Sequence, residues 1–278
     1  MSSINWDLEI TPKGFKEHGN QRKNWMFLIL LFVKRDIVTR YKQNVLGPIW
    51  FIISPLITSA IYYVVFFKIA NIPTESENPF LFYVSGVIPW QFFSASLSTV
   101  SGTFTNNSHI FGKVYFPRII TPISSLLTQL FQFSMQLVIF LGIAILVFDF
   151  SFGTEDVLTR IGVGLFCLIL MMLISMGFGL MFSSLIAKYR DMGQVIGFIM
   201  QLWMYGTPII YPSSIVPVNL KPIVSLNPMV SVFNALRYTF FGGPWSESLI
   251  YPVLFGCTVG VVGYTLFKRT EKNFIDSI

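Results

Sequence analysis

Charged side chains are scarce in this chain of 278 residues. Asp, Glu, Lys and Arg together make up 12% of the sequence, whereas hydrophobic residues make up 53%. A soluble domain typically carries about 25% charged residues. The chain lacks the polar surface that would keep it in water, which argues against a soluble enzyme, a disordered tail and a nucleic-acid binder. An integral membrane protein is the remaining interpretation.

Residues that build disulfides and metal sites are also rare. The two cysteines, Cys167 and Cys257, lie in apolar runs, and the two histidines, His18 and His109, are far apart. No disulfide framework and no metal-ligand spacing follows from these four residues. The phosphate-binding pattern G-x-x-x-x-G-K-[ST] is absent. We therefore expect no cofactor, no metal and no ATP site in this chain.

Long uncharged runs are abundant. Each is close to or above the roughly 20 residues that a helix needs to cross a bilayer, and none alternates as a barrel strand would. The expected fold class is all-α integral membrane, with six transmembrane helices. The expected spans are residues 45–67, 80–104, 119–148, 161–187, 192–211 and 249–267.

Three segments flank or interrupt these spans. Residues 1–44 are expected to be a cytoplasmic N-terminus with an amphipathic helix over 25–41 lying in the membrane interface. Residues 212–247 contain an apolar stretch too short to cross, so a re-entrant external helical hairpin is expected, with a rigid external cap as the alternative. Residues 268–278 form a tail, which completes a domain plan of 1–44, 45–267 and 268–278.

The charges that remain lie in the loops. Most of the 19 Lys and Arg residues fall on one side of the expected spans, which predicts cytoplasmic N- and C-termini. All 13 carboxylates lie outside the spans, which disfavours coupling to an ion gradient. Asp149, Glu155 and Asp156 cluster in one expected external loop. They are either the acid pair of a membrane enzyme or part of an ordinary solvated loop.

Five segments resemble motifs of ABC-2-type polysaccharide export permeases over nearly the whole chain. In order they read VKRDIVTRYKQNVLGPIW (33–50), FGKVYFPR (111–118), KYRD (188–191), TPIIYP (207–212) and LNP (226–228) followed by Arg237. The chain is most similar to O-antigen (lipopolysaccharide) exporter permeases. Capsule and teichoic-acid export permeases share the layout.

The resemblance implies a partner and a cargo. It implies a homodimer in the bacterial inner membrane, joined to two copies of a separate nucleotide-binding ATPase subunit that binds ATP and Mg. It also implies export of an undecaprenyl-pyrophosphate-linked polysaccharide. A membrane enzyme acting on lipid-linked sugars is the alternative from another class, and it would need convergent carboxylates or a metal site.

Two candidate sites concern the cargo. Aromatic rings stack on sugars, so a path is expected along the first and fifth spans of a dimer, although belt or packing roles remain open. The basic residues at the start of the chain are expected to contact the lipid pyrophosphate, with attraction to anionic lipids as the alternative. The path residues are Trp50, Tyr62, Tyr63, Trp203 and Tyr205. The pyrophosphate contacts are Lys34, Arg35, Arg40 and Lys42.

Two further sites concern the partner and the exit. An apolar tip on a charged loop is suited to docking in a groove of the ATPase, although a solvated connector is the alternative. An arginine near the membrane in an outer gate needs a carbonyl or carboxylate partner. The coupling residues are Lys113, Val114, Tyr115, Phe116 and Arg118, with Lys188, Tyr189, Arg190 and Asp191 as a second contact. The gate residues are Asn227, Pro228 and Arg237.

Overall fold

The computed structural model describes residues 21–42, 47–111, 116–148, 157–189, 191–242 and 248–275, and its elements in these ranges are all helices. The long ones are α1 (Gln21–Lys42), α2 (Gly47–Tyr62), α3 (Pro79–Ser101), α6 (Ile120–Phe148), α7 (Val157–Lys188) and α11 (Ile250–Ile275). The shorter ones are η1 (Tyr63–Ile69), α4 (Thr103–Asn106), α5 (Ser108–Phe111), α8 (Met192–Tyr205), η2 (Ser213–Ile215), α9 (Lys221–Ser225) and α10 (Pro228–Phe241). The expected all-α class is confirmed.

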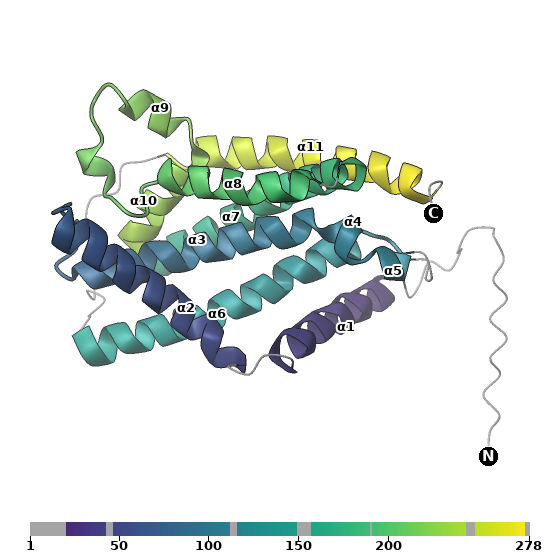
Figure 1. Ribbon diagram of the computed structural model, residues 1–278, viewed down its shortest axis with the longest axis horizontal. Coiled ribbons are helices and arrows are strands. Elements are labelled where there is room, and N and C mark those ends of the chain that lie inside the picture. The colour runs from purple at the N-terminus through teal and green to yellow at the C-terminus, as the bar shows by residue number, and fades with distance from the viewer. Residues whose placement is uncertain are drawn as a thin grey trace, which may run out of the picture.

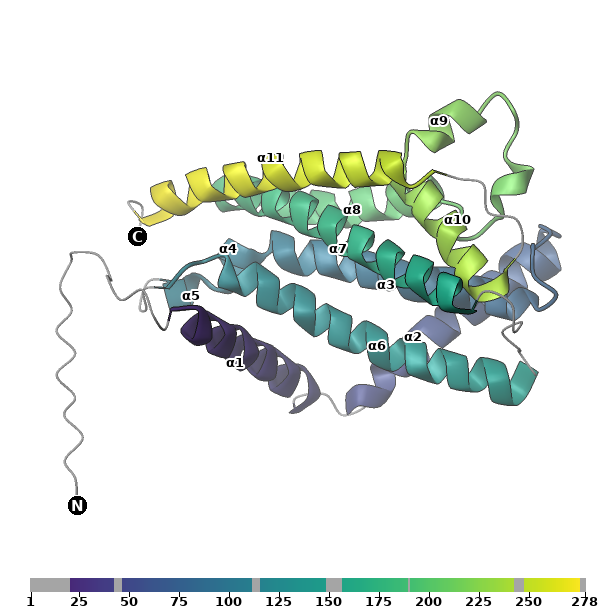
Figure 2. The same cartoon turned by 180° about the vertical axis from the view of Figure 1, so that it is seen from behind.

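The long helices run side by side along the long axis of the molecule (Figure 1). One end, here called the α4–α5 end, carries α4, α5 and the C-terminus of α11. The other end, the α9–α10 end, carries the small helices that follow α8. In Figure 2 the helix α10 crosses the end of the bundle, and it packs against α7 and α3.

Five helical segments are long and apolar enough to cross a membrane. They are Ile49–Ile69, Pro79–Ser101, Ile120–Leu146, Val157–Lys188 and Ile250–Lys272. Each corresponds to one of the expected spans, with ends that differ by up to five residues. The second ends earlier than expected because Gly102 separates α3 from the short α4.

The expected span 192–211 is represented by α8, which has 14 residues. At 1.5 Å per residue it is about 21 Å long, shorter than the roughly 30 Å hydrocarbon core. Turns rather than helix follow it over residues 206–209. The count of six crossings therefore stays a prediction, and so does a re-entrant position for residues 212–247.

Helix α3 forms the centre of the bundle. It packs against α7, α6 and α2, and its buried side chains include Phe82, Phe93 and Leu97. Some of its buried hydroxyls bond back to their own helix, as Ser85 Oγ does to the Phe82 carbonyl at 2.9 Å, whereas Ser96 Oγ and Tyr83 Oη have no hydrogen-bond partner among the described residues. Such local bonds reduce the number of unpaired donors in a Ser-rich helix that lies in an apolar interior.

Glycines bring α7 and α11 into close contact. A Cβ on Gly177 would lie 2.8 Å from the Gly260 nitrogen, and a Cβ on Gly263 would collide with the Gly177 carbonyl oxygen. Small residues that allow two backbones to approach are typical of helix pairs in membranes. Backbone contact between these glycines therefore fixes how α11 lies on α7.

Candidate functional site

The predicted interface segment is one continuous helix, α1, which lies alongside α6 (Figure 2). Its outer surface carries exposed apolar side chains, such as Phe27, Leu30 and Leu31. Phe32 lies on the other side and contacts Phe116, with ring centroids 5.4 Å apart. The helix is confirmed, and its position in the membrane interface stays a prediction.

The basic residues of α1 differ in their surroundings. Lys34 is exposed. The Arg35 guanidinium pairs with Asp36 at 2.7 Å and donates to Asn107 Oδ1 at 3.3 Å, at the junction of α4 and α5. Lys42 ends the helix, and its side chain lies outside the described part of the chain.

Arg40 reaches across to α6. Its Nη1 donates to Gln132 Oε1 at 3.2 Å. In the amide orientation that satisfies both groups, both Arg40 Nη atoms lie 3.0 Å from the Gln129 amide oxygen. Two Gln side chains on one face of α6 therefore hold this guanidinium against the bundle.

The predicted coupling loop is described only at its flanks, because Lys113, Val114 and Tyr115 lie outside the described residues. Phe116 is half-buried between Phe32 and Phe111. These contacts connect one flank of the loop to α1. The predicted contact of this loop with an ATPase stays untested.

Arg118 is bound to the end of α11. Its side chain is buried, and its Nη1 donates to the Glu271 carbonyl at 3.2 Å. Its backbone N–H donates to Glu271 Oε1 at 3.2 Å. Arg118 thus joins the base of the coupling loop to the C-terminal helix of the same chain.

The second predicted contact lies at the connection of α7 and α8. Tyr189 is half exposed, and the Lys188 ammonium lies 5.1 Å from its ring centre. Asp191 is exposed at the start of α8. Arg190 lies outside the described residues. The open position of Tyr189 and Asp191 leaves them free to meet a partner.

The five predicted path residues do not form one cluster. Trp50 and Tyr62 are 12 positions apart on α2, which is about 18 Å along a helix. Tyr62 lies beside α8, where its hydroxyl donates to Met204 Sδ at 3.6 Å. Tyr63 stacks on Phe67 within its own segment. The Tyr62–Met204 bond thus joins α2 and α8 near the α9–α10 end.

The two predicted path residues of α8 point in different directions. Tyr205 is 52% exposed. Trp203 packs edge-on against Phe93 and Phe178, and its Nε1 donates to Asn227 Oδ1 at 2.8 Å. Trp203 thus has a packing role within the chain, whereas the Tyr205 ring is open to a ligand or a second copy.

Asn227, one of the predicted gate residues, is the centre of a hydrogen-bond cluster. Its Oδ1 also accepts from the Met229 backbone N–H at 3.0 Å, which caps α10. Its Nδ2 donates to the Gly206 carbonyl and to Thr207 Oγ1, both at 2.9 Å. Pro228 follows as the first residue of α10. One side chain therefore ties the end of α8 to the start of α10.

Arg237 also binds the turn that follows α8. It is 7% exposed, and its Nη2 donates to the Ile209 carbonyl at 3.3 Å and its Nη1 to the Tyr211 carbonyl at 3.4 Å. Its guanidinium lies 4.0 Å from the ring centre of Phe82 on α3. The predicted carbonyl partner of this arginine is confirmed. The motifs TPIIYP and LNP, distant in sequence, are thus bonded to each other.

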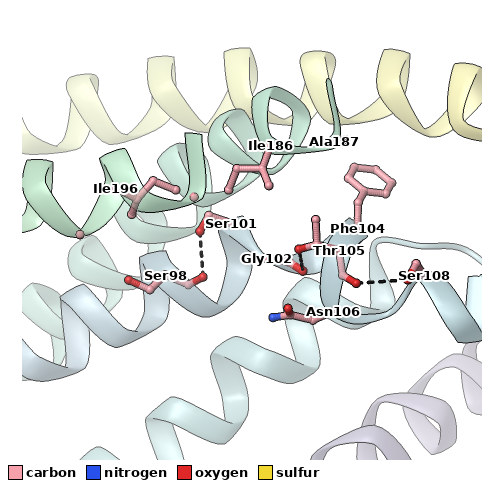
Figure 3. A pocket seen from close by; sticks show the side chains of 12 residues that line it. Ser98, Ser101, Gly102, Phe104, Thr105, Asn106, Ser108, Ile186, Ala187 and Ile196 are labelled. Carbon is pink, nitrogen blue, oxygen red and sulfur yellow. Dashed lines mark hydrogen bonds between the residues drawn. The ribbon is translucent and has the colours of Figure 1, made fainter. Parts of the chain in front are cut away.

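A cavity that the sequence reasoning missed opens at the α4–α5 end. It has a volume of about 680 Å³ and lies between α3–α5 on one side and α7–α8 on the other. Figure 3 shows its hydroxyl-bearing wall, where Ser101, Thr105 and Ser108 each donate to the backbone carbonyl three residues earlier. The opposite wall is apolar, with Ile186 and Ile196. The run of Ser and Thr over 96–108 was the available signal.

No group of three His, Cys, Asp or Glu residues that could hold a metal ion occurs in the part of the chain that the structure describes. The suggested acid cluster of Asp149, Glu155 and Asp156 lies outside the described residues. The described residues form hydrogen-bonded clusters, aromatic contacts and cavities.

Known proteins resemble this chain over most of its length. Residues 28–241 match the ABC-2 type transporter family. The O-antigen export system permease protein RfbA of Klebsiella pneumoniae is 28% identical over 90% of this chain and 94% of its own length. The protein of the same name from Myxococcus xanthus is 26% identical over 90% and 95%. The polysialic acid transport protein KpsM of Escherichia coli is 23% identical over 87% and 93%. This chain is a multi-pass membrane protein that belongs to the ABC-2 type transporter family.

Proposed function

We propose that this chain is the transmembrane permease subunit of an ABC exporter for undecaprenyl-pyrophosphate-linked O-antigen polysaccharide in the bacterial inner membrane. One observation carries the proposal: similarity to O-antigen export permeases extends over 90% of the chain and about 94% of those relatives. The family match over residues 28–241 includes four of the five long apolar helices and the motifs around α8 and α10.

The energy source is proposed to be a separate ATPase subunit. The sequence contains no phosphate-binding loop of its own, and hydrolysis must then occur in a partner that binds ATP and Mg. The flanks of residues 112–115 and the exposed Tyr189 are the proposed docking points. The basic residues gather at the α4–α5 end, which supports its assignment to the cytoplasmic side.

The cargo path is proposed to lie between two copies of the chain. A sugar polymer has to cross roughly 30 Å of hydrocarbon, and one bundle filled by side chains leaves no room for it. Helix α2 is the least buried of the long apolar segments and leaves Trp50, Ile57 and Ile61 exposed. Tyr205 of α8 is exposed near the same end as the C-terminus of α2.

Capsule polysaccharide is the second candidate cargo. The polysialic acid transport relative supports it, at lower identity than the O-antigen relatives. The test is genetic: the permease gene is deleted, and surface O-antigen and capsule are measured separately. We expect loss of surface O-antigen, with intracellular lipid-linked polysaccharide accumulating. Loss of capsule with normal O-antigen would favour the second candidate, and loss of neither would contradict the proposed function.

The partner is tested by co-purification with the ATPase encoded nearby. Tyr115→Ala is the informative variant because Phe116 also packs on Phe32 and would disturb α1. We expect Tyr115→Ala to lower ATPase recovery or to uncouple hydrolysis from export. Phe131→Ala, which removes an exposed ring on α6, is the matched control. Turnover of a lipid-linked sugar by the purified chain alone would instead favour a membrane enzyme.

A further inference from the structure

A second cavity at the α4–α5 end lies between α1 and the rest of the bundle. Its volume is about 400 Å³, and its walls come from α1, α3, α6 and the segment around α4 and α5. A water molecule occupies about 30 Å³ of liquid, so the cavity admits an anion of several atoms. Its lining side chains are polar or charged except for Ile110.

The charge of this lining is positive. Two guanidinium groups, from Arg35 and Arg40, face one carboxylate, that of Asp36, which gives a formal charge of +1 without counting His109. An arginine fork matches phosphate oxygens with two parallel N–H donors, although Arg35 Nε and Nη2 both donate to Asp36 Oδ1 in this structure. Amides and hydroxyls such as Asn106 and Ser125 surround them and provide further polar partners.

Both arginines are held in place before any ligand arrives. Arg40 is fixed by its bonds to Gln132 and Gln129 on α6. Arg35 is fixed by Asp36, and its guanidinium lies 4.6 Å from the ring centre of Phe32. Because such pre-ordering reduces the entropy lost on binding, these side chains are suited to a ligand site.

The cavity also lies at a boundary between polar and apolar surroundings. The outer face of α1 carries exposed apolar side chains, such as Phe27, Leu30 and Leu31, and the exposed Lys34, whereas Arg35 and Arg40 line the cavity. A helix of this kind places its polar side at the depth of lipid headgroups. Basic pockets between membrane helices bind lipid headgroups of this charge.

We propose that this cavity binds the diphosphate group of the polyprenyl-linked cargo, with Arg35 and Arg40 as its main contacts. The inference rests on the proposed function and narrows the predicted set of basic residues, since Lys34 is exposed and does not line the cavity. It adds the α4–α5 segment as the opposite wall, through Asn107 and His109, which the sequence did not suggest.

The α4–α5 wall of the cavity also connects this site to the predicted coupling loop. Arg35 bonds to Asn107 on one flank of the predicted coupling loop, and Phe32 contacts Phe116 on the other. A diphosphate in the cavity therefore contacts α1 and the segment that leads into the loop at the same time. Cargo binding is thereby linked to the loop that is proposed to meet the ATPase.

The test uses the complete complex of permease and ATPase in phosphatidylcholine nanodiscs, with undecaprenyl pyrophosphate as the probe. Binding and stimulation of ATP hydrolysis are both measured. We expect Arg40→Gln and Arg35→Gln each to weaken binding by about tenfold and to reduce stimulation. Arg40→Lys, which keeps the charge and loses the fork, should fall between Arg40→Gln and the wild type.

Arg269→Gln is the matched control, because it removes an exposed arginine on α11 outside the cavity. It should leave binding unchanged. Size-exclusion profiles and ATPase recovery verify that each variant is folded. If Arg35→Gln and Arg40→Gln both bind undecaprenyl pyrophosphate as tightly as the wild type, the proposed site is wrong. If the wild-type complex exports polysaccharide in the same study, the proposed function still holds.

Two further arms identify the source of the phosphate. The first replaces the probe with phosphatidylglycerol in the nanodisc, and the second with inorganic pyrophosphate in solution. If phosphatidylglycerol or inorganic pyrophosphate stimulates ATP hydrolysis as strongly as undecaprenyl pyrophosphate does, and Arg40→Gln abolishes this effect, the cavity is a general site for lipid headgroups or free anions. This result overturns the cargo assignment. A response to undecaprenyl pyrophosphate alone supports it. A wild-type complex that exports no polysaccharide removes both the proposed function and the inference.

Discussion

Pro55 interrupts the hydrogen-bond ladder of α2, and a residue from another helix repairs it. Proline has no backbone N–H, so the carbonyl four residues earlier, that of Phe51, loses its helical donor. The Gln136 side chain of α6 donates to this carbonyl at 2.8 Å. In the hydrocarbon core no water is present to donate a hydrogen bond to an unpaired carbonyl. The proline and the glutamine thus form one structural unit.

The dependence of Gln136 on Pro55 is testable by a double-mutant cycle. We expect Gln136→Leu to destabilise the protein by about 0.6–2 kcal/mol, since the Phe51 carbonyl loses the Gln136 donor. In a Pro55→Ala background the carbonyl regains its helical donor, and the same change should have a smaller effect. Thermal unfolding in detergent measures both. Equal effects in the two backgrounds would contradict the coupling.

Asn227 is the second residue whose role depends on partners far away in sequence. Asn227→Ala removes the acceptor of Trp203 Nε1 and the cap of α10 together. We expect a loss of about 1–3 kcal/mol of stability, since these bonds are part-buried and an unpaired donor costs about 1–3 kcal/mol when it is fully buried. Thermal unfolding and surface O-antigen are the measurements. Ser225→Ala, which removes an exposed hydroxyl nearby, should behave as wild type.

At the scale of the element, the helix pair α7–α11 depends on glycine. Gly263→Ala would press a methyl group against the Gly177 carbonyl, and we expect lower thermal stability and a smaller folded fraction on size exclusion. Gly142→Ala on α6 is the control, because nothing lies within 4 Å of its Cβ position. Alanine favours a helix by about 1 kcal/mol over glycine, so the control should be neutral or stabilising. Equal stability of the two variants would exclude this close packing.

The elements themselves could be predicted well where composition decides them. Five spans and the helix at the start of the chain follow from uncharged runs and from a mixed apolar and basic pattern. The expected span 192–211 was less accurate, since α8 ends at Tyr205. The turn beyond it is held by Asn227 and Arg237, which belong to a later segment. A local pattern of hydrophobicity contains no information about such partners.

At the scale of the whole molecule, the exposed ring of Tyr205 and the packed ring of Trp203 distinguish the two faces of α8. In a background without Cys167 and Cys257, we expect Tyr205→Cys to cross-link two copies of the chain and to block export. Trp203→Cys should not cross-link, because its position points toward Phe93 and Asn227. Export and gel mobility with and without oxidant are the measurements.

Val138→Cys is the control for this experiment, since it is exposed on α6, away from the proposed interface. Cross-linking at Val138 but not at Tyr205 would place the contact between copies on another face. Cross-linking at Tyr205 without any loss of export would retain the dimer and contradict a path beside α8.

The sequence by itself determined that the chain spans a membrane, that it is helical and which family it resembles. These properties depend on composition, on run length and on short motifs, all of which are local. Only the tertiary structure decided which polar groups meet: Gln136 with Phe51, Trp203 with Asn227, and Arg118 with Glu271. The same holds for the cavity in which Arg35 and Arg40 face the α4–α5 segment. The physical reason is that an unpaired polar group is costly in an apolar interior, and packing brings its partner from a distant helix.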